Sequence, residues 1–422
     1  MKIMMLSWEY PPKVIGGLAR AVADLSEALA KEGHQVAVVT GDWPESKPTE
    51  YASGVKVYRV NQFFPKPMDF LEEVHFMNYH FCQKGMELLQ NGDVDLIHAH
   101  DWLTAPSAKV LKHAFQKPLA ATIHATEWGR NNGLHNDFQR HISDLEWWLT
   151  YEAYQVICCS EYMRAELRRI FQVPEDKLNV IPNGVQVREF SQVHPDLDQW
   201  RRNWALPEED IIFYVGRHVY EKGIDLLLEA APKILENHPQ AKFILAGRGP
   251  CTEELKQKSS SLGLEAKVLF AGFIDDKTRN SLYRLASAAV FPSRYEPFGI
   301  VALEAMAAQA PVVVSDVGGF RETVRHEVNG LTFYSGNANS LADNVIKLLA
   351  NKILARSLSK QAYSDVLEKY DWKQIARQTA ESYRSTPVGP KVKGNSYGVT
   401  AVTADLLDKG GHVRESSNHG RR

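Results

Sequence analysis

The chain has 422 residues, of which 44% are hydrophobic and 24% charged, and its formal net charge at pH 7 is −2. This length exceeds what one hydrophobic core usually serves, so we expect a soluble globular protein with two domains. The near-neutral charge gives no electrostatic reason to expect nucleic acid or an anionic membrane as a partner.

The N-terminus and the cysteines bear on the cellular compartment of the protein. Residues 1–8 are largely apolar, but the chain turns polar at Glu9 and breaks at the pair Pro11-Pro12. This run is too short for a signal peptide or a membrane span, so we expect no targeting segment and no stable membrane insertion. The cysteines show no metal or redox spacing, which predicts reduced core thiols in a cytoplasmic protein. They are Cys82, Cys158, Cys159 and Cys251.

In the first half of the chain, short apolar runs alternate with longer amphipathic segments, which is the pattern of a parallel sheet with crossover helices. We predict helices over residues 18–32 and 161–171. The predicted strands cover residues 3–6, 36–39, 55–60, 95–98, 119–123, 156–159 and 180–181.

A second series of strands follows, and two sheets of this size indicate an α/β protein with two domains, residues 1–190 and 208–370. Residues 191–207 form the predicted linker, because the region from Gln186 to Pro207 carries charges, prolines and no clear period. The predicted strands of the second series cover residues 211–215, 243–246, 268–271, 289–291 and 312–314.

The end of the chain divides into two parts. Residues 371–385 have a helical apolar pattern, so we expect a helix that packs against another element. Residues 386–422 are rich in Gly, Ser, Lys and Arg and are predicted to be disordered. The apolar positions of the helix are Trp372, Ile375, Ala376, Ala380 and Tyr383.

A glycine pair, Gly16-Gly17, follows the first predicted strand and opens the first helix. Glycines at such a place let backbone N–H groups approach phosphate oxygens, and the positive end of the helix favours an anion. Lys13 can add a positive charge. The alternative is a strand-to-helix turn that needs a positive φ. Because the pattern Gly-x-Gly-x-x-Gly is absent, we expect no nicotinamide cofactor.

Histidines recur at the ends of first-domain strands. His98 and His100 lie on one face of a strand, but no third ligand stands at a convincing spacing, so we predict no metal site there. The segment Asp93-Val94-Asp95 resembles a metal-binding Asp-x-Asp. It precedes a strand, however, where Asp is ordinary turn chemistry, and we predict no metal there either.

Polar and aromatic side chains next to these histidines suit a sugar. Asp101, His124 and Glu127 can form hydrogen bonds with sugar hydroxyl groups. Trp102 and Trp128 can offer their ring faces to a glycan, and the alternative is that either tryptophan packs in the core.

In the second domain, Arg217 and Lys222 lie on a loop between a predicted strand and a helix, within the segment Gly216 to Gly223. Open parallel sheets bind ligands at the carboxyl ends of their strands. Two cations there can bind a diphosphate and stabilise the charge that develops as it leaves.

Two carboxylates, Glu296 and Glu304, flank an apolar stretch that should be buried, and buried carboxylates without partners are costly. If Gly299 marks the entry to a helix, Glu304 lies about one turn inside it and Glu296 stays on the preceding loop, roughly 10 Å away. Such a pair can contact opposite ends of one nucleotide-sugar, with its diphosphate near the positive end of the helix.

Together these motifs resemble those of retaining glycosyltransferases of the GT-B fold, the glycogen/starch synthase and sucrose synthase superfamily, over nearly all of residues 1–385. The segment from Glu296 to Glu304 resembles the E-x7-E signature of that superfamily. Arg217 and Lys222 resemble its donor-phosphate pair. The resemblance implies two Rossmann-like, doubly wound domains that face each other across a cleft, with the acceptor side in the first and the nucleotide-sugar in the second. The last helix then crosses back to the first domain.

The resemblance also implies roles for single residues. Glu296 would contact the donor sugar, Glu304 the ribose, and Arg217 with Lys222 the diphosphate. His124 matches a histidine near the transferred sugar, and Asp101 matches the aspartate of the histidine-aspartate-tryptophan motif. The donor-binding set is Gly16, Gly17, Arg217, Lys222, Glu296, Phe298, Gly299 and Glu304, and the acceptor or phosphate contacts are Lys13, Glu127, Trp102 and Trp128.

Three features depart from the bacterial starch and glycogen synthases. Lys13 is separated from Gly16 by two residues rather than one, which displaces it from its usual role. Those synthases commonly have a cysteine at the position of Phe298. The phenylalanine is a feature that this chain shares with glycosyltransferase family 4. The chain is also shorter, which bears on the glucan acceptor more than on the chemistry.

The implied activity is retaining transfer of a hexosyl group, with glucose as the expected one, from ADP-glucose or UDP-glucose to an α-1,4-glucan. No cofactor and no metal are expected, and the oligomeric state does not follow from the residues. One alternative is a family 4 transferase with a small or lipid-linked acceptor. The other is a non-catalytic sugar- or nucleotide-binding protein, against which the intact set of Arg217, Lys222, Glu296 and Glu304 argues.

Removal of residues 386–422 is expected to leave transferase activity intact, because a segment almost free of large apolar residues contributes little to a packed core. The measurement compares turnover of the truncated and complete chains. A large loss on truncation would show that the tail is structural.

Overall fold

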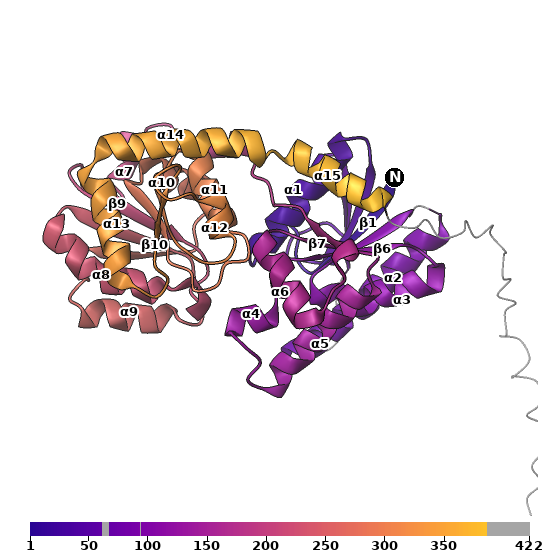
Figure 1. Ribbon diagram of the computed structural model, residues 1–422. Helices are drawn as coiled ribbons and strands as arrows, with labels where there is room; N and C mark the ends of the chain where they lie inside the picture. The colour runs from indigo at the N-terminus through magenta and orange to yellow at the C-terminus, as the bar shows by residue number, and fades with distance from the viewer. Residues whose placement is uncertain (61–66, 93, 386–422) are drawn as a thin grey trace, which may run out of the picture. The chain divides into compact units, whose positions relative to one another are not determined.

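The computed structural model describes residues 1–60, 67–92 and 94–385, and these residues form two sheets with helices packed on them (Figure 1). The first sheet has the order β3-β4-β2-β1-β5-β6-β7-β8, and within it only the β3–β4 pair is antiparallel. Its strands are β1 (Lys2–Ser7), β2 (Gln35–Gly41), β3 (Thr49–Ala52), β4 (Val55–Val60), β5 (Leu96–His100), β6 (Leu119–Ile123), β7 (Gln155–Cys158) and β8 (Leu178–Val180).

The helices that follow these strands include α1, which begins directly after the glycine pair, and α5 and α6, which flank β7 in the chain. Short 3-10 turns lie at Trp102–Thr104 and Val187–Ser191. The helices are α1 (Gly17–Lys31), α2 (Phe70–Gln90), α3 (Ala105–Phe115), α4 (Glu127–Asn131), α5 (Asp137–Glu152) and α6 (Glu161–Phe171).

The second sheet is entirely parallel, with the order β11-β10-β9-β12-β13-β14. Its strands are β9 (Asp210–Val215), β10 (Ala241–Ala246), β11 (Val268–Gly272), β12 (Ala288–Phe291), β13 (Val312–Ser315) and β14 (Leu331–Phe333). Its helices are α8 (Ile224–Asn237), α9 (Thr252–Ser261), α10 (Asp276–Leu285), α11 (Ile300–Ala307), α12 (Phe320–Thr323), α13 (Ala338–Ala350) and α14 (Lys352–Lys369).

The central strands are apolar on both faces because helices cover both sides of each sheet. In β1, the side chains from Ile3 to Leu6 are almost completely buried, and β13 buries Val312, Val313 and Val314 in the same way. In each sheet the strand order reverses beside the first strand of the series, β1 or β9. Ligands of open α/β sheets bind at the carboxyl ends of the strands at such a reversal.

The twelve predicted strands are confirmed, with ends that shift by at most two residues, and the two helices predicted in the first half of the chain correspond to α1 and α6. Two strands were not predicted. The edge strand β3 has four residues that are mostly exposed, and β14 has only three residues, so neither leaves a strong apolar pattern. The 191–207 segment contains a short helix, α7 (Leu197–Arg201), and the domain boundaries themselves stay predictions.

The predicted C-terminal helix is confirmed as α15 (Trp372–Arg384), and it packs against α1 (Figure 1). Its apolar face joins the core cluster that contains Ile3 and Leu29, and Arg377 pairs with Glu32 at 2.7 Å. The last helix of the described chain therefore completes the core beneath the first sheet. The predicted disorder of residues 386–422 lies outside the described residues, as does Asp93.

Two expectations about cysteines and membranes are tested by the described residues. Cys158 and Cys159 are buried free thiols as predicted, but Cys82 on α2 and Cys251 before α9 are partly exposed, so the core prediction is wrong for these two. The helices of the described part of the chain are each too short or too polar to cross a membrane.

The contact between α1 and α15 contains a carboxylate with an unusual pKa. Asp24 on α1 accepts hydrogen bonds from Trp372 Nε1 at 3.0 Å and from Gln186 Nε2 at 3.1 Å. The pKa of Asp24 is raised to about 7, mainly by burial and in smaller part by the nearby carboxylates of Glu189 and Glu27, while the two hydrogen bonds oppose the shift.

Asp24→Asn is expected to make the fold less sensitive to pH. In the folded protein Asp24 keeps its proton up to about pH 7, whereas in the unfolded chain it loses it near pH 3.8. The free energy of unfolding of the wild type therefore falls as pH rises from about 3.8 to about 7. Asparagine cannot ionise, so the melting temperature of the variant relative to wild type should rise between pH 5 and pH 8. Asp198→Asn, at an exposed position, serves as the control. Parallel pH profiles for wild type and Asp24→Asn would contradict the prediction.

Candidate active site

The glycine pair lies at the carboxyl end of β1, where Gly16 caps α1 with an extended backbone, φ −151°. Neither Gly16 nor Gly17 has a positive φ, so the turn that needs one is the wrong explanation for them. The backbone N–H groups of Ile15 and Gly16 donate to Glu9 Oε2 at 2.5 and 3.1 Å. A carboxylate thus accepts from the loop amides that we predicted to face phosphate oxygens.

Glu9 was not singled out from the sequence, because nothing in its local pattern distinguishes it from a surface glutamate. Burial raises the pKa of Glu9, and the two backbone hydrogen bonds together with the charges of Lys13 and Arg217 oppose that shift. Lys13 is itself buried, with its Nζ 4.6 Å from the ring centre of Trp8. Its cation therefore lies against an aromatic face beside the glycine loop.

The cations predicted to bind a diphosphate follow β9. Lys222 ends a 3-10 turn (Tyr220–Lys222), and Gly223 continues it in the left-handed region at φ 63°. A Cβ at Gly223 would lie 2.0 Å from the carbonyl oxygen of Pro292, so only glycine fits. This close approach brings the loops after β9 and β12 together.

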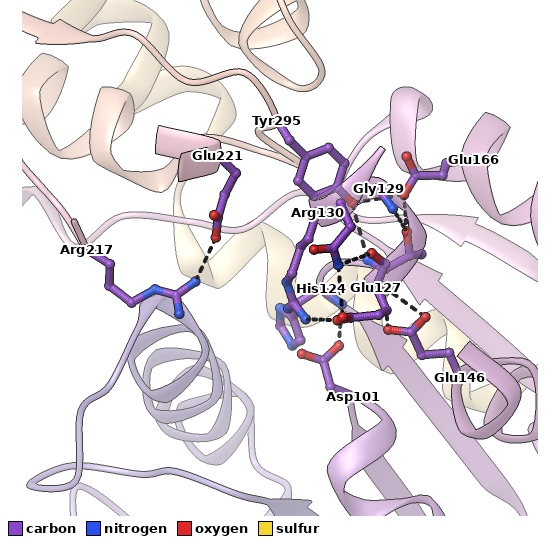
Figure 2. A network of polar contacts seen from close by, with 12 residues as sticks. Asp101, His124, Glu127, Gly129, Arg130, Glu146, Glu166, Arg217, Glu221 and Tyr295 are labelled. Atoms are coloured by element: carbon purple, nitrogen blue, oxygen red, sulfur yellow. Dashed lines mark hydrogen bonds and ion pairs between the residues drawn. The ribbon is translucent and has the colours of Figure 1, made fainter. Parts of the chain in front are cut away.

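The same approach forms an ion pair between two predicted site residues. Lys222 Nζ lies 2.7 Å from Glu296 Oε2, which also accepts from Ser293 Oγ at 3.1 Å. Glu296 is only 7% exposed. Arg217 pairs instead with Glu221 at 3.5 Å and leaves 46% of its side chain exposed (Figure 2). One predicted cation is thus held against the buried carboxylate, and the other stays accessible.

Glu304 lies on α11, which begins at Ile300 after Gly299, so the predicted placement of both carboxylates is confirmed. Its oxygens lie 3.3 Å from Tyr283 Oη and 3.6 Å from Arg279 Nη1. Burying this carboxylate is tolerated because a cation and a hydroxyl group lie beside it. Arg279 and Tyr283 come from α10, and their role left no signal in the sequence.

The first turn of α1 lies near the carboxylate of Glu304. Arg20 and Glu304 line one small cavity together with Ile300, and a Cβ on Gly17 would lie 3.4 Å from Ile300 Cδ1. Arg20 also pairs with Asp276 on α10. The glycine loop and the start of α11 are therefore neighbours. Phe298 is 5% exposed and packs edge-on against Tyr370, which places its ring in the core.

Asp101, His124 and Glu127 belong to one polar network (Figure 2). Asp101 Oδ1 accepts the backbone N–H of His124 at 2.7 Å. The backbone N–H of Glu127 donates to both carboxylate oxygens of Glu146 at 2.9 and 3.0 Å. Burial lowers the pKa of Arg130, whose side chain is partly exposed, but the charges of Asp101, Glu146 and Glu127 outweigh this effect and raise it. Arg130 and Glu146 were not predicted.

A tyrosine from the loop after β12 enters this network (Figure 2). Tyr295 Oη accepts the backbone N–H of Thr126 at 3.2 Å and donates to Glu166 Oε1 at 2.9 Å. A second link joins Ser160 Oγ to the carbonyl oxygen of Pro297 at 2.6 Å. The residues around Glu296 thus contact those around His124.

The two tryptophans differ in their surroundings. Trp102 is 5% exposed and packs edge-on against Phe70, which supports the core alternative for this residue. Trp128 is half-buried, and the guanidinium of Arg169 lies 4.0 Å from its ring centre. One ring face of Trp128 is therefore covered by a cation.

His98 and His100 do lie on one face of β5, as predicted, with ring centres 4.1 Å apart. Burial lowers the pKa of His98 to about 3 and that of His100 well below its usual range. Burial also lowers the pKa of His124, while the charge of Asp101 opposes the shift. All three imidazoles are therefore neutral at pH 7.

Two family models match the chain. Residues 15–189 match Glycosyltransferase Family 4, and residues 196–365 match Glycosyl transferases group 1.

Similar proteins match over nearly the whole length. The chain is 42% identical over 394 residues to an uncharacterized glycosyltransferase of Methanocaldococcus jannaschii, covering 91% of this chain and 98% of that protein. It is 34% identical over 410 residues to the glycogen synthase of Mycobacterium tuberculosis, covering 93% and 96%. The solved structure of sucrose-phosphate synthase from Thermosynechococcus elongatus aligns with a TM-score of 0.79 at 28% identity, covering 90% of this chain and 98% of that one.

Proposed function

The chain belongs to the glycosyltransferases of the GT-B fold, and from that membership we propose that it moves a glucosyl group from a nucleotide diphosphate sugar to an α-1,4-glucan with retention at the anomeric carbon. The ion pair of Lys222 with the buried carboxylate of Glu296 carries the proposal. It lies at the carboxyl ends of β9 and β12, where the strand order of the second sheet reverses.

The proposed roles follow from charge and accessibility. Arg217 and Lys222 bind the diphosphate and neutralise it as it leaves, and Glu296 accepts hydrogen bonds from hydroxyl groups of the donor sugar. Glu304 contacts the ribose. The acceptor hydroxyl attacks on the face from which the diphosphate departs. This chemistry requires no metal and no organic cofactor, because the two cations supply the positive charge.

The acceptor is proposed from two observations. The identity of 34% to a glycogen synthase and the Asp101-Trp102 motif favour a glucan. A second candidate is a small acceptor, which the similarity to a sucrose-phosphate synthase and Phe298 favour. The four free thiols fit a reducing compartment, so we place the reaction in the cytoplasm.

The experiment that tests this function measures release of nucleoside diphosphate from ADP-glucose and from UDP-glucose, each with and without glycogen or maltooligosaccharide. Release that depends on glucan, with longer chains as product, would support the glucan synthase and identify its donor. Slow release that glucan does not change would favour the small acceptor. Absence of turnover with every nucleotide sugar would overturn the proposal.

Lys222→Ala and Glu296→Ala are each expected to lower turnover by about 10²- to 10³-fold, the usual loss when one stabilising charge or donor is removed. The matched controls are Lys258→Ala and Glu229→Ala, which break an ion pair between α8 and α9. These should keep wild-type turnover. Because Lys222→Ala leaves a buried carboxylate unpaired, thermal unfolding is measured for all four variants. Near wild-type turnover in both site variants would contradict the assignment.

A further inference from the structure

Three histidines form a chain of contacts from the core to the polar network of the candidate site. At its inner end, His98 is bonded at both ring nitrogens. Its Nε2 lies 2.8 Å from Thr122 Oγ1, and its Nδ1 lies 2.7 Å from the Oη of Tyr383 on α15. His98 is therefore held by the neighbouring strand β6 and by the C-terminal helix.

His100 lies between His98 and His124. Its ring packs on that of His98, and its Nδ1 lies 3.2 Å from His124 Nε2. The other nitrogen, His100 Nε2, is buried and has no hydrogen-bond partner among the described residues. The single hydrogen bond of this ring is thus directed at His124.

Neutrality of both rings restricts where the hydrogens lie. Burial lowers the pKa of His100 and of His124, and the neighbouring imidazoles lower that of His100 further. Each neutral imidazole carries one ring hydrogen, so in the bond between them one nitrogen donates and the other accepts.

The orphaned nitrogen decides the direction. If His124 donated from Nε2, the hydrogen of His100 would have to lie on its own Nε2, and a buried N–H would be left without an acceptor. If His100 donates from Nδ1, its Nε2 carries only a lone pair. Orphaned buried N–H groups are rarer in native proteins than unfilled acceptors. The second arrangement is therefore favoured.

We infer that His100 is a positioning residue that donates from Nδ1 to His124 Nε2 and thereby fixes the hydrogen of His124 on Nδ1. His124 then acts as a hydrogen-bond donor and not as a base. Asp101 adds to this by holding the backbone N–H of His124 at 2.7 Å. The inference rests on the proposed function in one respect, that the group receiving this hydrogen bond is a hydroxyl of the transferred sugar.

The tautomer is measured by nitrogen NMR of the full-length protein with ¹⁵N-labelled histidine rings, in which His124→Gln identifies the signals of His124. We expect a protonated Nδ1 and an unprotonated Nε2 at His124 from pH 6 to pH 8. A protonated Nε2, or protonation of both nitrogens at pH 7, would overturn the inference.

Two substitutions of His100 separate positioning from packing. Asparagine can place a donor where Nδ1 stands, whereas leucine fills the space without one. His100→Leu should lower kcat by about 10- to 100-fold, as when the partner that orients a functional imidazole is lost, and His100→Asn should stay within a few-fold of wild type. The tautomer signal of His124 should persist in His100→Asn and be lost in His100→Leu. His113→Leu, at an exposed histidine of α3, is the control.

The outcomes separate the two proposals. Equal kcat for folded His100→Asn and His100→Leu would contradict a positioning role, and if His100→Leu fails to fold, the wild-type tautomer still decides. A wild-type protein with the expected tautomer but without turnover of any nucleotide sugar would refute the proposed function and leave the hydrogen-bond assignment standing.

Discussion

The ion pair of Lys222 and Glu296 is the interaction on which the second sheet's end of the site depends. A carboxylate that is only 7% exposed needs a partner, and Lys222 reaches it because Gly223 lets the loop after β9 pass against the carbonyl oxygen of Pro292. Any side chain at Gly223 would push these loops apart. The pair therefore links backbone geometry, burial of charge and the position of the cation that is proposed to stabilise the leaving diphosphate.

The first sheet's end of the site is built differently, from uncharged histidines beside a group of one cation and three carboxylates. His98, His100 and His124 are uncharged because burial penalises the imidazolium form, while Arg130 lies among three carboxylates. Tyr383 connects this region to α15, whose apolar face completes the core beneath β1. The last helix is thus part of the environment that keeps the histidines neutral.

Prediction from the sequence succeeded where a local pattern has one structural solution. Apolar runs of four to six residues became the central strands because both faces of a covered sheet are dry. The loop position of Glu296 and the helical position of Glu304 followed from Gly299, which adopts φ 96° at the start of α11. The strands β3 and β14 were missed because a short edge strand needs few apolar residues.

The sequence by itself determined most strands of the two sheets, the glycine loop, the cation loop and the carboxylate pair, because each depends on residues that are close along the chain. Only the tertiary structure decided which groups these side chains meet. Arg279 beside Glu304, Tyr295 against Thr126 and Tyr383 against His98 each join residues of separate elements. Partners of buried polar groups are chosen by packing between such elements, and no local pattern encodes that choice.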